Sequence, residues 1–147
     1  MPKRAAGILL YRRPPNQRRR QVLLVLPRSA GAKGPEPSAW SIPKGKPLRN
    51  ERLIDTARRE FEEETARPAP KRLVELGEVT ESSGKRVAVW AAHEEWPSRD
   101  LQPNGHDPAA DIAEVRWFDI EQAQVLLRPG QAQLLGQLDR LVRWVTD

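Results

Sequence analysis

The stretch that decides the fold is GKPLRNERLIDTARREFEEETARP, residues 45–68. It contains five glutamates, and four of them fall within residues 60–64. Like charges three or four positions apart destabilise a helix by about 0.2–0.5 kcal/mol per pair. A helix-forming segment that collects carboxylates in this way indicates a nearby cation that offsets their repulsion.

The helix itself is predicted over residues 51–65, with Asn50 as its cap and Pro68 as its stop. Apolar residues recur in this segment at helical spacing and form a single stripe, which consists of Leu53, Ile54, Ala57 and Phe61. We expect this stripe to face the core.

Three of the glutamates share one face of this helix. At about 100° per residue, Glu63 and Glu64 lie within about 60° of Glu60. Glu64 falls at the edge of the apolar stripe, where an unpaired charge costs several kcal/mol. Arg58 and Arg59 leave this face, and we expect Arg59 to reach one carboxylate without neutralising all three.

A cluster of carboxylate oxygens suits a hard cation such as Mg²⁺ or Mn²⁺. The chain has no cysteine and only two histidines, which argues against zinc. The alternative is an acidic solvent-exposed face interrupted by arginines. Helical spacing alone does not decide between these two interpretations.

Apolar runs and turn residues predict the other elements. Strands are predicted at 4–11, 21–28, 40–43, 72–82, 85–95 and 114–119. A helix over 120–127 would be capped by Asp119, and a last helix would begin at Pro129 and reach about residue 145. This order predicts one domain, residues 1–147, of the α/β class with a mixed sheet.

Composition limits the environment and the partners. No window of about 20 apolar residues could span a membrane, and a cytoplasmic protein is the default expectation. The net charge of +5 suggests an anionic partner such as a nucleotide or nucleic acid. Much of this charge lies in RRPPNQRRR, residues 12–20. That run is either a solvated hairpin loop or part of a contact with such a partner.

The spacing around the glutamates is more specific than their helical pattern. Gly45, Glu51 and residues 59–64 match G-x5-E-x7-R-E-U-x-E-E-x-G-U, in which U is a bulky aliphatic or aromatic residue. The segment thus resembles the Nudix hydrolase box at six of its seven fixed positions. It departs at Ala66, which replaces glycine, and at Arg67, which replaces an apolar residue. A left-handed helix terminus at Ala66 would cost about 1 kcal/mol.

The resemblance covers nearly the whole chain and implies the Nudix α/β/α sandwich with a mixed central β-sheet. Family members cleave a nucleoside diphosphate linked to a further moiety, by attack of water on phosphorus. The resemblance implies Mg²⁺ or Mn²⁺ held by the carbonyl of Gly45 and by Glu60, Glu63 and Glu64. It implies that Arg59 holds these carboxylates in register.

Two roles stay open from the sequence. Glu51 either binds the metal through water or orients the loop. The general base is either Glu60 or a residue outside the box, where Asp111 is the first candidate and Glu114 the second. Asp111 lies six residues before Trp117, where relatives often carry a glutamate, and its alternative role is that of a turn residue.

Four further residues are candidates for substrate binding. Lys44 and Lys46 flank Gly45 and could bind phosphates as point charges, as could Arg28 after the second strand. Trp40 could stack on a base. The alternatives are a solvated surface for the three cations and core packing for the tryptophan.

The substrate class follows from WSIPKGK, residues 40–46, which resembles Nudix enzymes acting on diadenosine polyphosphates or nucleoside triphosphates. We expect a pyrophosphohydrolase of nucleoside polyphosphates, either a dinucleoside polyphosphate such as diadenosine tetraphosphate or a (d)NTP. The alternatives are removal of pyrophosphate from the 5′ end of RNA, and a non-catalytic Nudix-fold module that binds nucleotide or RNA. We expect a monomer or a homodimer.

Overall fold

The computed structural model describes residues 3–14, 19–31, 34–101 and 111–146. Its strands are β1 (Arg4–Arg12), β2 (Gln21–Pro27), β3 (Lys44–Gly45), β4 (Val74–Thr80), β5 (Arg86–His93) and β6 (Ile112–Asp119). Its helices are α1 (Leu53–Thr65), α2 (Ile120–Leu126) and α3 (Gln133–Thr146). The predicted strands and helices are therefore present, apart from the differences at 40–43 and at two helix starts given below.

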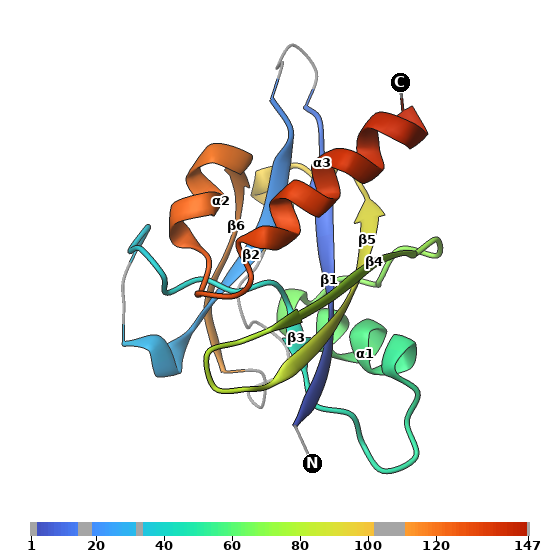
Figure 1. The fold of residues 1–147 in the computed structure, drawn as a ribbon. Coiled ribbons are helices and arrows are strands. Elements are labelled where there is room, and N and C mark those ends of the chain that lie inside the picture. The colour runs from blue at the N-terminus through green and yellow to red at the C-terminus, as the bar shows by residue number, and fades with distance from the viewer. Residues whose placement is uncertain (1–2, 15–18, 32–33, 102–110, 147) are drawn as a thin grey trace.

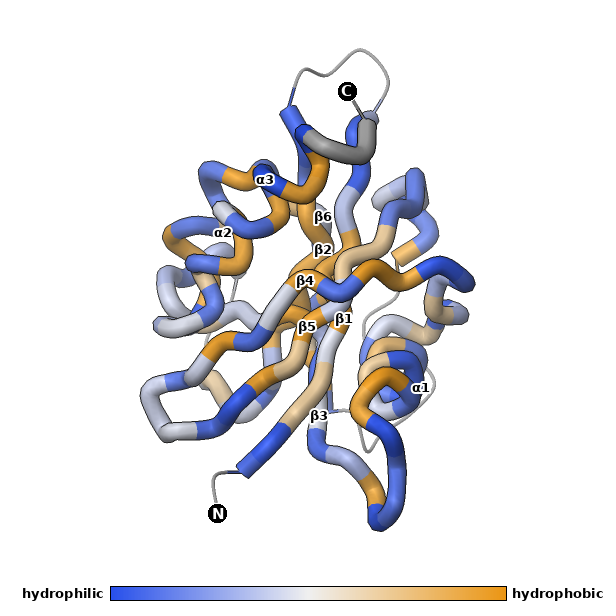
Figure 2. The backbone as a smooth tube through the Cα atoms, turned by 45° about the vertical axis from the view of Figure 1, so that its right-hand side comes forward, coloured by the Kyte–Doolittle hydropathy of each residue, from blue (hydrophilic) through white to orange (hydrophobic). Residues whose placement is uncertain are grey.

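The strands form one mixed sheet in the order β4–β5–β1–β2–β6, with β3 also paired to β1 (Figure 1). β1 and β5 run parallel, and the other pairs are antiparallel. Helix α1 covers one face of the sheet, and α2 and α3 cover the other (Figure 2). This arrangement confirms the expected α/β/α sandwich.

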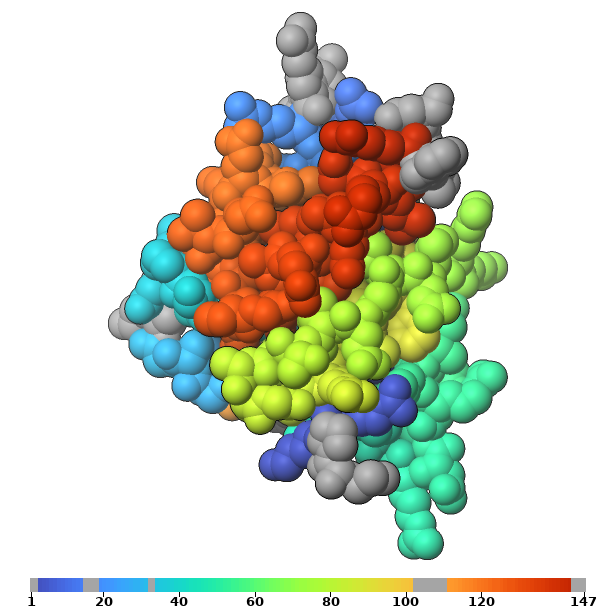
Figure 3. Space-filling view, in the orientation of Figure 1, coloured from blue at the N-terminus to red at the C-terminus, as the bar shows by residue number. Residues whose placement is uncertain are grey.

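The two central strands are apolar without interruption because helices cover both of their faces. Residues 5–10 of β1 lie almost wholly buried, as do residues 22–26 of β2. Side chains alternate between the faces, so Leu9 joins the core under α2 and α3, whereas Ile8 joins the core under α1. Figure 3 shows α3 lying beside β4 on the outer surface.

Helix α1 begins later than predicted. Its first residue is Leu53, and Arg52 occupies the N-cap position without a side-chain cap bond. The prediction of Asn50 as the cap is wrong, because Asn50 has a left-handed backbone with φ 64°. The carboxylate of Glu51 instead accepts hydrogen bonds from the N–H of Leu48 and the hydroxyl of Thr56, which holds a turn before the helix.

Of the two predicted starts of the C-terminal helices, one is confirmed and one is wrong. Asp119 caps α2 in a capping box with Gln122, as predicted. The prediction of Pro129 as the first residue of the last helix is wrong, because α3 begins at Gln133. Gly130 has φ 94° and its α-carbon faces the carbonyl of Thr80, where an added Cβ would meet that oxygen at 2.6 Å.

Two further segments differ from expectation or lie outside the described residues. Residues 40–43 form isolated bridges to Val25 and Leu127 rather than a regular strand. The run 12–20 joins β1 to β2, which pair antiparallel, but its residues 15–18 are outside the described part of the chain. None of the helices in that part is long and apolar enough to cross a membrane.

We predict that Ala66→Gly stabilises the protein. Ala66 ends α1 in the left-handed conformation at φ 60°, and its N–H donates to the carbonyl of Glu62. Glycine removes the steric cost of that conformation, so the free energy of unfolding should rise by about 0.5–1 kcal/mol. Urea denaturation measures this difference.

The matched control is Ala69→Gly, at a position outside the left-handed region. This change adds flexibility to the unfolded chain and removes a methyl group packed against the core under α1, so it should lower stability. Equal loss of stability in both variants would contradict the strain at Ala66.

Candidate functional site

The glutamates of α1 meet the backbone of β3. β3 pairs with β1 through Ala6 and Gly45, and α1 packs across β1. The carboxylate of Glu60 lies so close to Gly45 that an added Cβ would come within 2.1 Å of its Cδ and 2.4 Å of both oxygens. Only glycine permits this approach, which explains the residue at position 45.

Glu64 lies next to Glu60 at the edge of the core, as its place on the helix predicted. Glu64 is only 7% exposed. Burial raises its pKa well above the usual range, and the neighbouring charge of Glu60 adds to this rise, while the backbone N–H of Lys44 hydrogen-bonds the carboxylate and opposes it. Burial also raises the pKa of Glu60. Because burial and the charge of Glu60 both disfavour the ionised form of Glu64, this carboxyl holds a proton more readily than a free glutamate when no cation is bound.

Arg59 contacts three carboxylates, more than the one that its place on the helix suggested, and Glu64 is not among them. Its Nε and Nη2 donate to the two oxygens of Glu51, each at 2.9 Å. Its Nη1 donates to Glu60 at 2.8 Å and to Glu63 at 3.2 Å. The planar fork of five N–H donors makes this reach possible, and Nη2 also donates to the carbonyl of Lys46.

Glu51 has both carboxylate oxygens occupied by the protein. Besides Arg59, the N–H of Leu48 and the hydroxyl of Thr56 donate to it. The hydrogen bonds from Arg59, followed by that from Leu48, hold the pKa of Glu51 at about 2. Of the two roles left open by the sequence, this geometry favours orientation of the loop.

The donors around Gly45 suit a hard cation only in part. Glu60 and Glu64 present adjacent carboxylates beside the backbone of β3, in a pocket that disfavours two negative charges. Glu63 is turned toward Arg59. Within the described residues, no three acidic or histidine side chains converge into a ligand set. A cation that takes three carboxylates therefore requires Glu63 to leave Arg59.

A buried polar network connects this site to the start of α3. The ammonium of Lys44 lies 3.5 Å from Glu81, and these side chains are 10% and 9% exposed. Gln131, which is fully buried, donates to Glu81 at 2.9 Å and to the hydroxyl of Ser41 at 3.1 Å. The N–H of Ile42 donates to the amide oxygen of Gln131. The network fixes the segment that carries Gly45.

Lys44 is therefore not the exposed cation that its place in the sequence suggested. Its side chain turns inward because Glu81 offers a buried counter-charge. Lys46 is exposed, as expected for a group at the mouth of the site. The other predicted phosphate ligand, Arg28, lies 3.8 Å from the carboxylate of Asp111, and its N–H donates to the carbonyl of Asp111.

The two candidate bases outside α1 have protein partners. Asp111 is 63% exposed, lies beside Arg28, and has a left-handed backbone with φ 53°. Glu114 accepts a hydrogen bond from the N–H of Gly34 and contacts the guanidinium of Arg116. The structure thus brings Asp111 together with Arg28, and Glu60 together with Glu63 and Glu64.

Trp40 is a core residue, so its prediction as a stacking platform is wrong. It is fully buried, packs edge-on against Phe118 with ring centroids 4.7 Å apart, and donates from its indole to the carbonyl of Gly34. Trp40 bridges to Leu127 and the next residue, Ser41, bridges to Val25, which places this segment between β2 and the end of α2.

Three residues of this region escaped the sequence analysis, namely Glu81, Arg128 and Gln131. Glu81 and Arg128 line a cavity of about 320 Å³, together with Ser38, Ser82, Ser83 and Pro129. The only sequence signal was a glutamate at the end of an alternating strand, next to the hairpin turn. Glu81, in the wall of this cavity, pairs with Lys44, the residue before Gly45.

Comparison with known proteins identifies the family. A family model described as the NUDIX domain matches residues 1–140. The chain belongs to the Nudix family. As the resemblance predicted, it is a hydrolase of the class that acts on nucleoside phosphates.

Solved structures share this fold at low sequence identity. An Ap4A hydrolase from C. elegans, in a binary complex, superposes with a TM-score of 0.72 at 22% identity, covering 97% of this chain and 98% of that one. The NUDIX domain of Shewanella oneidensis NrtR, complexed with ADP ribose, gives 0.72 at 19%, covering 97% and 89%. RenU, a Nudix hydrolase from M. smegmatis, gives 0.65 at 24%, covering 99% and 88%. No curated protein matches the sequence.

We predict that Glu81→Ala destabilises the protein by about 3 kcal/mol, because it leaves Lys44 buried without its counter-charge and Gln131 without its acceptor. Thermal or urea unfolding measures the loss. The matched control is Glu78→Ala on β4, whose exposed partners are Arg4 and Arg86 and which should cost at most about 1 kcal/mol. Similar losses in both variants would show that the buried pair has no special role.

We predict that Glu64→Gln makes the metal-free protein more stable at neutral pH. The raised pKa of Glu64 means that the folded protein binds a proton which the unfolded chain releases above about pH 4.3. The parent therefore loses stability as the pH rises above that value, and the variant does not.

Urea denaturation in EDTA between pH 4 and pH 8 measures this difference, which should approach zero at the acidic end. Glu62→Gln serves as the control, because Glu62 is exposed on the opposite side of α1. Parallel pH profiles for the parent and Glu64→Gln would contradict the burial of a costly charge.

Proposed function

We propose that the chain is a Mg²⁺-dependent pyrophosphohydrolase of nucleoside polyphosphates. Its substrate is a dinucleoside polyphosphate such as diadenosine tetraphosphate, or a (d)NTP. Water attacks a phosphorus atom of the phosphoanhydride, the P–O bond to the leaving phosphate breaks, and the water loses a proton. Mn²⁺ is an alternative metal.

One observation carries this proposal, namely the buried Glu60–Glu64 pair pressed against the backbone of Gly45. Two neighbouring carboxyls that are buried at the edge of the core are an unfavourable arrangement for a structural surface. Arg59 already neutralises part of the cluster, yet the pKa of Glu64 stays raised because the site is buried. A hard cation bound between the carboxylates would relieve their repulsion.

In this proposal Glu60, Glu64 and the carbonyl of Gly45 hold the metal, and Glu63 joins them by exchanging Arg59 for the cation. When bound, the metal screens the polyanionic substrate and lowers the pKa of the attacking water. Arg59 keeps Glu60 in position by donating a hydrogen bond to its carboxylate. Arg59 is itself held by Glu51, which anchors the loop before α1. The Arg59 guanidinium thus acts as a positioning group, since its donors are taken by protein acceptors.

Glu60 is the better candidate for the general base. A general base must lie within reach of the attacking water, and the carboxylate of Glu60 lies beside Gly45 at the proposed metal site. Asp111 lies instead against the cationic Arg28, in an exposed position. We therefore assign Asp111 the role of orienting Arg28, which could meet a substrate phosphate.

The nucleoside is proposed to occupy the cavity lined by Ser38, Glu81, Ser82, Ser83, Arg128 and Pro129. Glu81 in the wall of this cavity pairs with Lys44. We propose that the polyphosphate extends from the nucleoside along Gly45, with the exposed Lys46 at the entrance. In support, the solved structures with this fold include an Ap4A hydrolase and a NUDIX domain holding ADP ribose.

The test is turnover of a substrate panel with Mg²⁺: diadenosine tetraphosphate, canonical and oxidised (d)NTPs, ADP-ribose and a 5′-triphosphorylated RNA. Glu63→Gln and Glu64→Gln should each reduce the rate by about 100-fold or more, because a metal ligand is lost. Glu62→Gln, which changes the same charge on the opposite face of α1, should retain the activity. Cleavage of the RNA alone would replace our substrate class by the 5′-end activity that the charge of +5 also fits.

Thermal stability provides an independent readout of the metal. Mg²⁺ should raise the melting temperature of the parent and of Glu62→Gln, and should have little effect on Glu64→Gln. No cleavage of any compound, together with no shift by Mg²⁺ or Mn²⁺, would overturn the proposed enzyme.

A further inference from the structure

A large cavity lies at the other end of β1 from the glutamates. It has a volume of about 670 Å³, within the range of small-molecule sites. Tyr11 forms part of its floor, five residues along β1 from Ala6, which pairs with Gly45. At the rise of a strand this separation is about 16 Å, so the cavity is distinct from the glutamate cluster.

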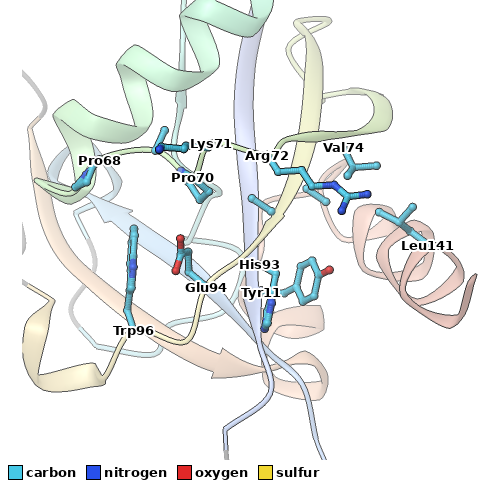
Figure 4. A pocket seen from close by; sticks show the side chains of 13 residues that line it. Tyr11, Pro68, Pro70, Lys71, Arg72, Val74, His93, Glu94, Trp96 and Leu141 are labelled. Carbon is cyan, nitrogen blue, oxygen red and sulfur yellow. The ribbon is translucent and has the colours of Figure 1, made fainter. Parts of the chain in front are cut away.

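The cavity exists because β4 does not extend as far as β5 at this end of the sheet. Val74 pairs with Ala91, and β5 continues to His93 without a partner on that side. The chain before Val74 contains Pro68 and Pro70, which lack the N–H needed to extend the ladder. The segment 68–72 therefore leaves the sheet and forms the opposite wall (Figure 4).

Both walls are held in place by side chains of neighbouring elements. Arg58 of α1 donates to the carbonyls of Pro70 and Lys71 at 2.8 and 2.9 Å. On the other side, Arg12 donates to the carbonyl of Trp96 and the hydroxyl of Ser98. The cavity is thus preformed rather than a gap between loose loops.

The floor offers aromatic surface. Tyr11 and His93 are cross-strand neighbours and stack with ring centroids 5.2 Å apart and an interplanar angle of 27°. The His93 side chain is 54% exposed, so its imidazole is open to a ligand. Trp96 closes one end of the cavity (Figure 4), backed by the guanidinium of Arg67 at 4.6 Å from its ring centroid.

The rim is cationic. Arg72 reaches from the 68–72 wall toward Tyr11 and Leu141 (Figure 4). Burial raises the pKa of Tyr11, and the charges of Arg20 and Arg72 oppose this rise, so both guanidiniums lie within electrostatic reach of the phenol. Among the described residues, neither side chain has an acidic partner within 4.0 Å, which leaves their charge available to an anion.

Two acidic side chains, Glu94 and Glu95, lie near the cavity. Glu95 accepts hydrogen bonds from the N–H of Arg13 and from His93. Glu94 points its carboxylate into the cavity beside Trp96 (Figure 4). Glu94 can accept hydrogen bonds from hydroxyl or amino groups of a ligand whose anionic end faces Arg72.

We propose that this cavity is a second ligand site, separate from the proposed reaction centre, which binds a nucleoside monophosphate. The base stacks over His93 toward Trp96, the ribose or an exocyclic amine meets Glu94, and the phosphate meets Arg72. Flat aromatic faces favour the base, and arginine forks favour the phosphate. The site would let a nucleotide bind without competing for the glutamates.

The test uses the full chain carrying Glu64→Gln, in EDTA, so that metal-dependent binding at the glutamates makes no contribution. Isothermal titration calorimetry with AMP should show one site. Arg72→Gln should weaken AMP binding at least tenfold through loss of a charged hydrogen bond. His93→Ala should weaken it by a similar factor through loss of stacking. Both side chains are exposed, so these variants should fold.

The matched control is Arg86→Gln, which removes the same charge at the other end of β5, where Arg86 lies near Glu78. It should change AMP affinity less than twofold. Adenosine and ribose 5-phosphate should each bind at least tenfold more weakly than AMP, because each lacks one half of the contacts.

Three results would overturn the proposal: absence of AMP binding in EDTA, equal affinity in Arg72→Gln and its parent, or equal affinity for AMP and ribose 5-phosphate. The last result would reduce the site to a general anion patch. None of these results depends on turnover by the parent enzyme, so the proposal and the proposed function fail separately.

Discussion

The structure depends on the contact between the Glu60 carboxylate and the bare backbone of Gly45. This contact requires a glycine, because any side chain at position 45 would overlap the carboxylate. It also requires that β3 lie against β1 while α1 packs on the same strand. The repulsion among neighbouring carboxylates is offset by Arg59, which binds Glu51, Glu60 and Glu63 at once. The position of the Glu60 carboxylate, its counter-charge on Arg59 and the backbone of Gly45 therefore depend on one another.

Behind this contact, a second set of polar groups ties the site to the far layer of the sandwich. Lys44, Glu81 and Gln131 connect the loop of Gly45 with the start of α3, and nearly all of their polar surface is buried. A buried ion pair adds little net stability, but the loss of one partner is costly. The network therefore acts on the position of the loop more than on the overall free energy of folding.

The local sequence predicted the strands, the face shared by Glu60, Glu63 and Glu64, and the cap at Asp119, because period and capping are properties of neighbouring residues.

The local sequence failed to predict a residue's surroundings where partners distant in the chain decide them. Trp40 looks like a stacking platform in the sequence, but it bridges to Leu127 and its ring is buried against Phe118. Lys44 looks exposed until Glu81, 37 positions away, supplies a buried counter-charge. Asn50 looks like a helix cap, but the carboxylate of Glu51 holds the turn instead.

The parallel pairing of β1 with β5 has a consequence for the order of folding. Its first rung joins Arg4 to Arg86, residues 82 positions apart, so the central pair of the sheet cannot form until most of the chain is available. Closing so long a segment costs conformational entropy before the contacts return it, which slows folding relative to a hairpin. During that interval the edge of β1 that later pairs with β5, and the edge of β2 that later pairs with β6, stay open to other chains. A newly made chain is therefore most vulnerable to aggregation before β5 has been synthesised.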